Sequence, residues 1–167
     1  MFNIKKHDND LYNTLISLSR NIFFYKSIKL PDIFETRIYL IFIHFSIMMI
    51  VFKKKGQSFE QKKYDSLFHN IEYNLRELGF GDVYVNKKMK EFNQILYDIL
   101  LKLNKSKETK KNDFEINDKL VLKYFPELDG QKSAKYKLFE KYLTNFYKFC
   151  FEISLKNMVR EAINYRG

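Results

Sequence analysis

The chain has 167 residues, of which 46 % are apolar and 17 % aromatic, so it can bury a sizeable core and is not disordered as a whole. Only 5 Gly and 2 Pro are too few turn-forming residues for a β-sandwich or β-barrel, and they favour long helices. The net charge of +10 suggests an anionic partner, but only five of the 30 basic residues are Arg, the side chain best suited to specific base recognition.

Apolar residues at helical spacing predict a first helix from residue 8 or 9 to about Tyr25. Pro31 disfavours a helical conformation in the residue before it, so the first helix must end by that point. Asp32 is then the expected N-cap of a second helix, with Glu35 three residues later as its capping-box partner.

The second helix contains fifteen consecutive residues without a formal charge, from Ile38 to Phe52. A bilayer span needs about 20 apolar residues, and this run is bounded by Arg37 and by Lys53. A helix that is apolar on all sides is otherwise the centre of a bundle. We therefore expect a buried central helix, with membrane-inserted and interfacial helices as the alternatives. His44 within it is expected to be buried, neutral and hydrogen-bonded.

A third helix is predicted from Phe59 to about Leu78, with Ser58 and Gln61 as its capping box. A fourth is predicted to begin near Asn86 as its N-cap, after a short extended segment at residues 83–85. Both helices carry apolar stripes that suit packing against the central helix.

The segment 104–113 is polar, Lys-rich and without periodicity, which predicts a flexible loop. Beyond it we expect a short helix ended by Pro126, a turn at Gly130 and a last helix of some thirty residues from near Ser133. The sequence thus predicts one all-α domain over residues 1–167, a bundle of about six helices around the apolar central helix.

Cys150 is the only cysteine and the three histidines are widely scattered, so we expect no disulfide, metal site or other cofactor. No nucleophile–base arrangement or suitably spaced carboxylate pair is recognisable, and we expect no enzyme activity. The N-terminus has no apolar signal region and contains acids, so we expect a cytoplasmic protein without a signal or transit peptide.

Two of the five glycines, Gly79 and Gly81, stand one residue apart where the third helix must end, and Asp82 follows them. A left-handed residue after a helix is most easily Gly, so Gly79 is the expected helix stop, and Phe80 is expected to fold back on Leu75 or a neighbouring apolar residue. We expect Gly81 and Asp82 to make a second sharp turn. A phosphate-binding loop is not indicated, because the glycines follow a helix and a third Gly is missing.

Two segments, "LPDIFETRIYLIFIH" (residues 30–44) and "LRELGFGDVYV" (residues 75–85), resemble the ubiquinol–cytochrome c chaperone family. The resemblance, which covers roughly residues 10 to 145, identifies these candidate motif or partner-binding residues: Tyr25, Pro31, Asp32, Arg37, His44, Arg76, Glu77, Gly79, Gly81 and Asp82. The chain departs from the family pattern in the fourth helix, where members often carry Tyr-Gly-Arg and this chain has Tyr97, Asp98 and no basic residue.

The resemblance implies an all-helical, non-catalytic assembly chaperone of bacterial type. Such a protein would bind newly made cytochrome b and promote assembly of respiratory complex III, peripheral to the inner membrane. The implied partners are cytochrome b, the ribosome, the anionic inner-membrane surface and a small helper protein. The alternative is a basic RNA- or ribosome-binding helical module without client specificity, and the positive charge can also reflect composition alone.

For the motif residues we advance one physical hypothesis: Arg37 and Arg76 bond to Asp32 or Asp82 and lock the double-glycine turn. Direct contact with the client is the alternative. Two aromatic clusters, "IFFY" (residues 22–25) and "NFYKFCF" (residues 145–151), are either core or part of a client groove.

Overall fold

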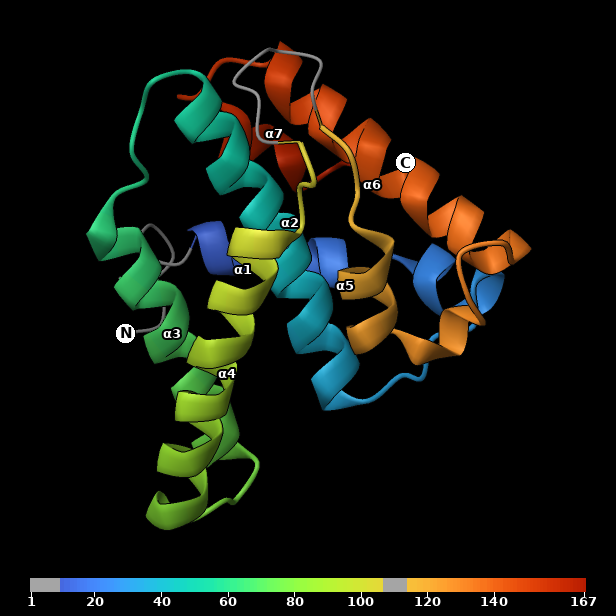
Figure 1. The fold of residues 1–167 in the computed structure, drawn as a ribbon. Coiled ribbons are helices and arrows are strands. Elements are labelled where there is room, and N and C mark those ends of the chain that lie inside the picture. Colours follow the sequence, from blue (N-terminus) through green and yellow to red (C-terminus); the bar gives the residue numbers. More distant parts are fainter. Residues whose placement is uncertain (1–9, 107–113) are drawn as a thin grey trace.

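The computed structural model describes residues 10–106 and 114–167, and within them all regular structure is helical apart from one isolated β-bridge (Figure 1). The elements are α1 (Asp10–Ser19), the π-helical turn η2 (Phe23–Ser27), α2 (Phe34–Lys54), α3 (Gln61–Glu77), α4 (Asp82–Lys102), α5 (Asp118–Tyr124), the 3₁₀ turn η3 (Pro126–Leu128), α6 (Ala134–Glu152) and α7 (Met158–Ala162). The all-α class is confirmed, with seven α-helices in the described residues where about six were predicted. The single domain over residues 1–167 stays a prediction.

Helix α2 is the centre of the fold, and α1, α4 and α6 all pack against it (Figure 1). Every residue from Leu40 to Met48 is buried, as expected for a helix that is apolar on all sides. Within the described ranges it is the one helix long and apolar enough to cross a membrane, but 67 % of its most apolar 18-residue window is buried in the protein. The prediction of a buried central helix is confirmed.

Helices α3 and α4 form an antiparallel hairpin whose tip extends away from the other helices (Figure 1). The base of the hairpin packs on the body, α4 against α2 and α3 against α1. The turn between the two helices, which contains both glycines of the second signature, is therefore the most projecting part of the hairpin.

Several predicted helix starts and ends were wrong. The first helix ends at Ser19, because Asn21 Oδ1 accepts from the Phe23 amide and its Nδ2 donates to the Arg166 carbonyl, 145 residues away. The last helix is interrupted after Glu152, where Ile153 is extended and its carbonyl accepts from Lys55 Nζ. Each break involves a bond to a distant part of the chain, and the first also has the local bond between Asn21 and Phe23.

Both predicted capping boxes were also wrong. Helix α2 begins after Ile33 and α3 after Glu60, and neither start has a side-chain cap. The Asp32 carboxylate instead accepts from the Arg37 guanidinium. The side-chain amide of Gln61 donates to Asp65 Oδ1 at 2.9 Å. The predicted start of the last helix near Ser133 is confirmed: Ser133 is the N-cap residue of α6, and its Oγ accepts from the Tyr136 backbone amide at 3.0 Å.

The turns after α5 follow the prediction. Pro126 begins η3 directly after the end of α5, and Gly130 has φ +94°. Of the predicted Lys-rich loop, residues 107–113 lie outside the described residues. Asn104, its first residue, forms the β-bridge with Ile116, which lies beyond the predicted loop.

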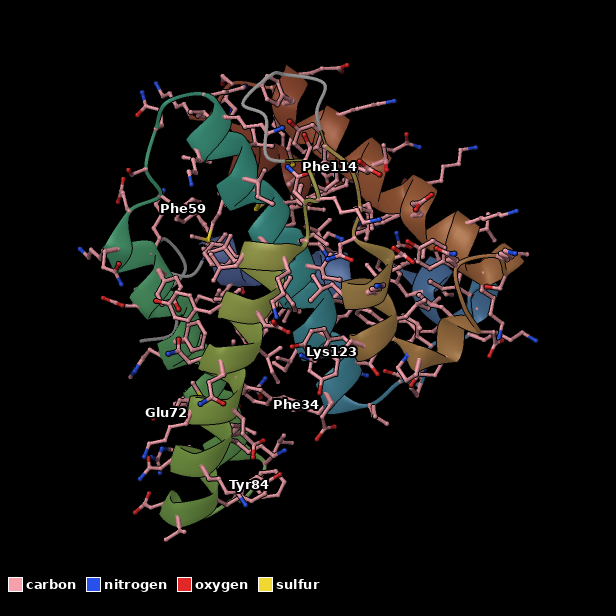
Figure 2. All side chains as sticks on the ribbon, in the orientation of Figure 1. Phe34, Phe59, Glu72, Tyr84, Phe114 and Lys123 are labelled. Carbon is pink, nitrogen blue, oxygen red and sulfur yellow. The ribbon has the colours of Figure 1, made fainter. Side chains whose placement is uncertain are left out.

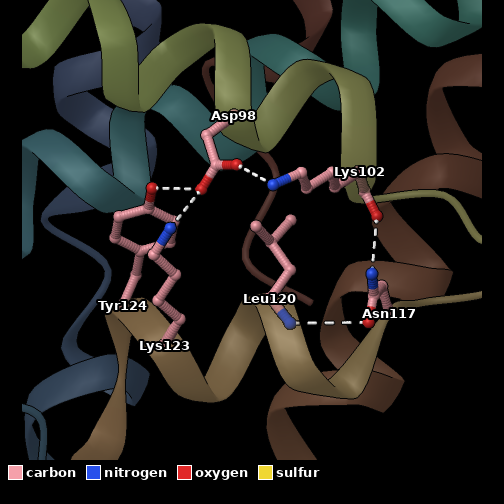
Figure 3. Close-up of polar contacts among 6 residues, drawn as sticks. All are labelled: Asp98, Lys102, Asn117, Leu120, Lys123 and Tyr124. Carbon is pink, nitrogen blue, oxygen red and sulfur yellow. Dashed lines mark hydrogen bonds and ion pairs between the residues drawn. The ribbon is translucent and has the colours of Figure 1, made fainter.

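Asp98 connects α4 to α5 (Figure 3). Its carboxylate accepts hydrogen bonds from Lys102 Nζ at 2.7 Å, Lys123 Nζ at 2.8 Å and the Tyr124 hydroxyl at 2.5 Å. Burial alone would raise the pKa of Asp98, but these three donors outweigh it and hold that pKa well below its usual range. The departure from the family pattern at this position therefore has a structural role, which is to join the two helices.

Candidate functional site

The tip of the α3–α4 hairpin is a well-formed helix stop. Gly79 has φ +94°, and its amide donates to the Arg76 carbonyl at 3.0 Å. The Phe80 amide reaches back to the Leu75 carbonyl at 3.5 Å. These two bonds are the Schellman arrangement, in which a left-handed Gly ends the helix. The role predicted for Gly79 is confirmed.

Gly81 differs from Gly79, and the second sharp turn predicted there was wrong. Its φ of −79° and ψ of 168° are accessible to any residue, and a Cβ added to it would meet no atom within 4 Å. Gly81 is simply the N-cap residue of α4, which begins at Asp82 rather than near Asn86. An acid in the first turn of a helix is favoured by the helix dipole, which explains the early start and the helical conformation of residues 83–85.

Arg76 and Asp82 form an ion pair across this turn, from the last turn of α3 to the first turn of α4. Glu72, one helical turn before Arg76, lies 4.0 Å from the same guanidinium. The predicted pairing of Arg76 with Asp82 is confirmed, and it joins the two helices beside the glycines. Glu77 is exposed as the last residue of α3.

Apolar side chains gather on this tip and are exposed. The structure describes ten exposed large apolar residues, and five of them lie between positions 73 and 84. They are Tyr73 (55 % exposed), Leu78 (57 %), Phe80 (41 %), Val83 (86 %) and Tyr84 (39 %), which together we call the tip patch. Single exposed apolar residues are ordinary, but five within twelve residues of one projecting hairpin are an unusual concentration, of the kind found at binding surfaces.

The tip patch is continuous with a row of side chains along α4. Phe80 stacks on Tyr84 with ring centroids 4.3 Å apart, and Lys88 Nζ lies 5.8 Å from the Tyr84 ring and 6.0 Å from the Phe92 ring. Phe92 in turn contacts Phe34 at the start of α2, at 6.2 Å between centroids. Figure 2 shows Tyr84 on the projecting hairpin and Phe34 where the hairpin meets α2. The row links the tip to the first signature segment.

In that first segment, Arg37 bonds to Asp32 through Nε at 3.0 Å and also through Nη2, so the predicted pairing is confirmed. The part predicted for this pair in locking the double-glycine turn was wrong, because the two residues flank the start of α2. The Asp32 carboxylate raises the pKa of Arg37 above its ordinary value. Tyr25 lies beside the pair, and its hydroxyl donates to the Ser19 carbonyl at 2.6 Å. Burial raises the pKa of Tyr25, and Arg37 partly opposes that rise. With half-buried Pro31, these residues fix the entry into α2.

His44, the last residue of the first signature segment, is fully buried in the core as predicted. Its Nδ1 donates to the Leu40 carbonyl at 2.6 Å, and its Nε2 accepts from the Tyr142 hydroxyl at 2.8 Å. Burial lowers the pKa of His44 to about 4, so the ring is neutral at pH 7. His44 joins α2 to α6 and is not accessible to a partner.

The two aromatic clusters belong mainly to the core. Phe24, Phe146 and Cys150 are fully buried, and only Ile22 of the first cluster is exposed. The tip patch was missed from the sequence because its members are interspersed with charged residues. The signal that could have found it is the run of apolar residues close to the two glycines, Leu78, Phe80, Val83 and Tyr84, interrupted only by Asp82, in a turn that faces solvent.

A cleft of about 770 Å³ lies between α1, α3 and α7. Its titratable lining includes Asp65 and His69, which are exposed side chains rather than a buried acid–base pair. Among residues 10–106 and 114–167, no group of three or more His, Cys, Asp or Glu side chains is placed to hold a metal ion. The tip is therefore the stronger candidate site.

Comparison with known families adds to this geometry. The family description that matches is "Ubiquinol-cytochrome C chaperone", over residues 26–135, a range that contains both signatures and the whole hairpin. No curated protein and no solved structure matches the chain closely enough to add a second comparison. Because the match covers more than half of the 167 residues, the chain belongs to the ubiquinol-cytochrome C chaperone family.

Proposed function

We propose that this protein is an assembly chaperone that binds newly made cytochrome b and promotes assembly of complex III, with the tip patch as the surface that contacts the client. The family is generally non-enzymatic and implies a client from complex III. The observation that carries the proposal is the group of exposed apolar side chains on the projecting hairpin, directly around the second signature.

The chemistry of the tip suits such a client. A membrane protein before assembly exposes apolar helices, which gain by burying surface against other apolar groups. Each tip side chain that becomes fully covered contributes roughly 1 kcal/mol, because about half of its surface is exposed beforehand. The bonds at Gly79 and the ion pair at Asp82 hold these side chains in place before binding, which lowers the entropy cost of association.

We further propose that the protein acts in the cytoplasm, at the inner face of the membrane and close to the ribosome, with a small helper protein as a possible further partner. The net charge of +10 favours both anionic lipid and ribosomal RNA. An apolar client interface depends weakly on salt, whereas an RNA interface weakens steeply as salt rises, so the two kinds of binding are separable.

Photocrosslinking tests the proposed surface. A photoreactive amino acid at Phe80 or Tyr84 should give a crosslink to newly made cytochrome b, and the crosslink should persist as salt is raised. Leu138, a 45 % exposed residue on α6, is the matched control position and should give none. Equal crosslinking from all three positions, or crosslinks that go to RNA and vanish with salt, would refute the proposal.

A deletion strain tests the function independently of the surface. Without the chaperone, the difference spectrum of b-type haem should lose the cytochrome b signal, and the wild-type gene should restore it. Unchanged cytochrome b in that strain would mean that the client has been assigned wrongly, even if the tip binds another protein.

A further inference from the structure

A shallow pocket of about 460 Å³ lies between α1 and the segment that follows α7. Two of the five arginines of the chain line it, Arg20 just after α1 and Arg166 near the C-terminus. Their described neighbours are all uncharged: Asn13, Ile16, Ser17, Asn21 and Ile22. Among the described lining residues the pocket therefore has two positive charges and no carboxylate.

The guanidinium of Arg166 is held in place by neutral acceptors. Its Nη1 donates to the carbonyls of Ile163 at 3.0 Å and Tyr165 at 2.7 Å, and its Nη2 donates to Ser17 Oγ at 3.2 Å. The backbone is fixed as well, since Asn21 Nδ2 donates to the Arg166 carbonyl at 3.3 Å. These bonds orient the group without neutralising its charge.

The two arginines of the signature segments, unlike Arg20 and Arg166, are paired with carboxylates. Arg37 and Arg76 each pair with an aspartate, whereas no carboxylate in the described parts of the chain lies within ion-pair distance of Arg20 or Arg166. Guanidinium groups form paired hydrogen bonds with phosphate oxygens in a way that lysine cannot. Two arginines that line one pocket, in a chain whose basic residues are mostly Lys, make a better anion site than the general positive surface.

We propose that Arg20 and Arg166 form a binding site for a phosphate group. Ile22 at the edge of the pocket is 59 % exposed, so apolar carbons attached to that phosphate have a surface to contact. The phosphate can come from an anionic phospholipid or from a soluble phosphate compound. The site is built from residues outside the range 26–135 that matches the family, and it does not depend on the proposed client.

The experiment measures binding to two probes with the full chain. Inorganic phosphate is titrated by calorimetry, and vesicles of phosphatidylcholine with or without phosphatidic acid are used in flotation. Arg20→Gln removes one guanidinium from an exposed residue, and Arg20→Lys keeps the charge without the fork. Lys26→Gln, an exposed residue nearby in sequence that does not line the pocket, is the control for the loss of one charge.

We expect Arg20→Gln to weaken phosphate binding about tenfold, Arg20→Lys to recover only part of it, and Lys26→Gln to change it little. If vesicle binding follows the same order and requires phosphatidic acid, the ligand is a lipid headgroup. If only inorganic phosphate binding follows it, the ligand is a soluble phosphate compound. Equal losses in Arg20→Gln and Lys26→Gln, or no phosphate binding by the wild type, would overturn the proposal.

Discussion

Placing the same side chain at the two signature glycines should have opposite effects on stability. Gly79 has φ +94°, a conformation that costs a residue with a Cβ about 1–2 kcal/mol. Part of that cost is offset because the unfolded chain also loses freedom, by about 0.4–1 kcal/mol. Gly79→Ser should therefore lower the free energy of unfolding by roughly 1 kcal/mol, or lower Tm by about 2–4 °C.

Gly81→Ser carries no such cost, because φ is −79° and the added Cβ meets no atom. Serine is also a better helix N-cap than glycine by a few tenths of a kcal/mol. We expect the free energy of unfolding to be unchanged or slightly raised. Urea denaturation followed by far-UV circular dichroism measures both variants.

The comparison also has a functional reading. If Gly81→Ser folds normally but loses crosslinking to the client, then Gly81 is needed where the client approaches the turn. The reasoning fails if Gly79→Ser is as stable as the wild type, or if Gly81→Ser loses as much stability as Gly79→Ser. Either result would mean that the turn does not have the backbone described here.

Three further predictions concern buried or paired charges. Asp98→Asn should cost roughly 2 kcal/mol in urea denaturation at pH 7, whereas Asp129→Asn, at an exposed ion pair, should cost almost nothing. His44 has a pKa of about 4 in the folded protein against an ordinary 6.5, so between these values the unfolded state binds the extra proton. The free energy of unfolding should therefore fall by roughly 3 kcal/mol as pH drops from 6.5 to 4. A His44→Gln variant with the same pH dependence would contradict this assignment. Asp82→Ala should cost only about 0.5 kcal/mol, since the carboxylate is 81 % exposed, so a strong loss of client crosslinking with intact folding would indicate direct contact.

The central helix and the α3 stop could be predicted from sequence because their causes are local. The uncharged run of α2 has one stable environment in a bundle, and Gly79 supplies a backbone conformation that other residues avoid. The end of α1 and the break before α7 could not be predicted in the same way. Asn21 and Ile153 stop their helices through bonds to Arg166 and Lys55, partners more than 90 residues away.

In the candidate site, too, the features with local causes could be predicted from the sequence and those that depend on tertiary packing could not. The pairs at Arg37 and Arg76 could be predicted because each partner is five or six residues away. The capping role given to Asp32 failed for the same reason, since a nearby guanidinium competes successfully for a carboxylate that would otherwise cap the helix. Exposure of the tip patch depends on where the hairpin leaves the body, which is a property of the packing of α3 and α4 and is not encoded in any one segment.

A chaperone that exposes apolar surface must avoid binding to itself, and the arrangement of the tip provides for this. The five tip-patch residues all lie between positions 73 and 84, at the narrow projecting end of the hairpin, so two tips can cover little of each other's surface. Charged groups lie among them, including the ion pair of Arg76 and Asp82, and the whole molecule carries a net charge of +10 that opposes close approach of two copies. On the proposed function, an extended apolar segment of the client has no such restriction, because it carries no equal charge and is not confined to a narrow tip. The same rigidity that orders the tip patch thus favours a long apolar segment over a second copy of the chaperone.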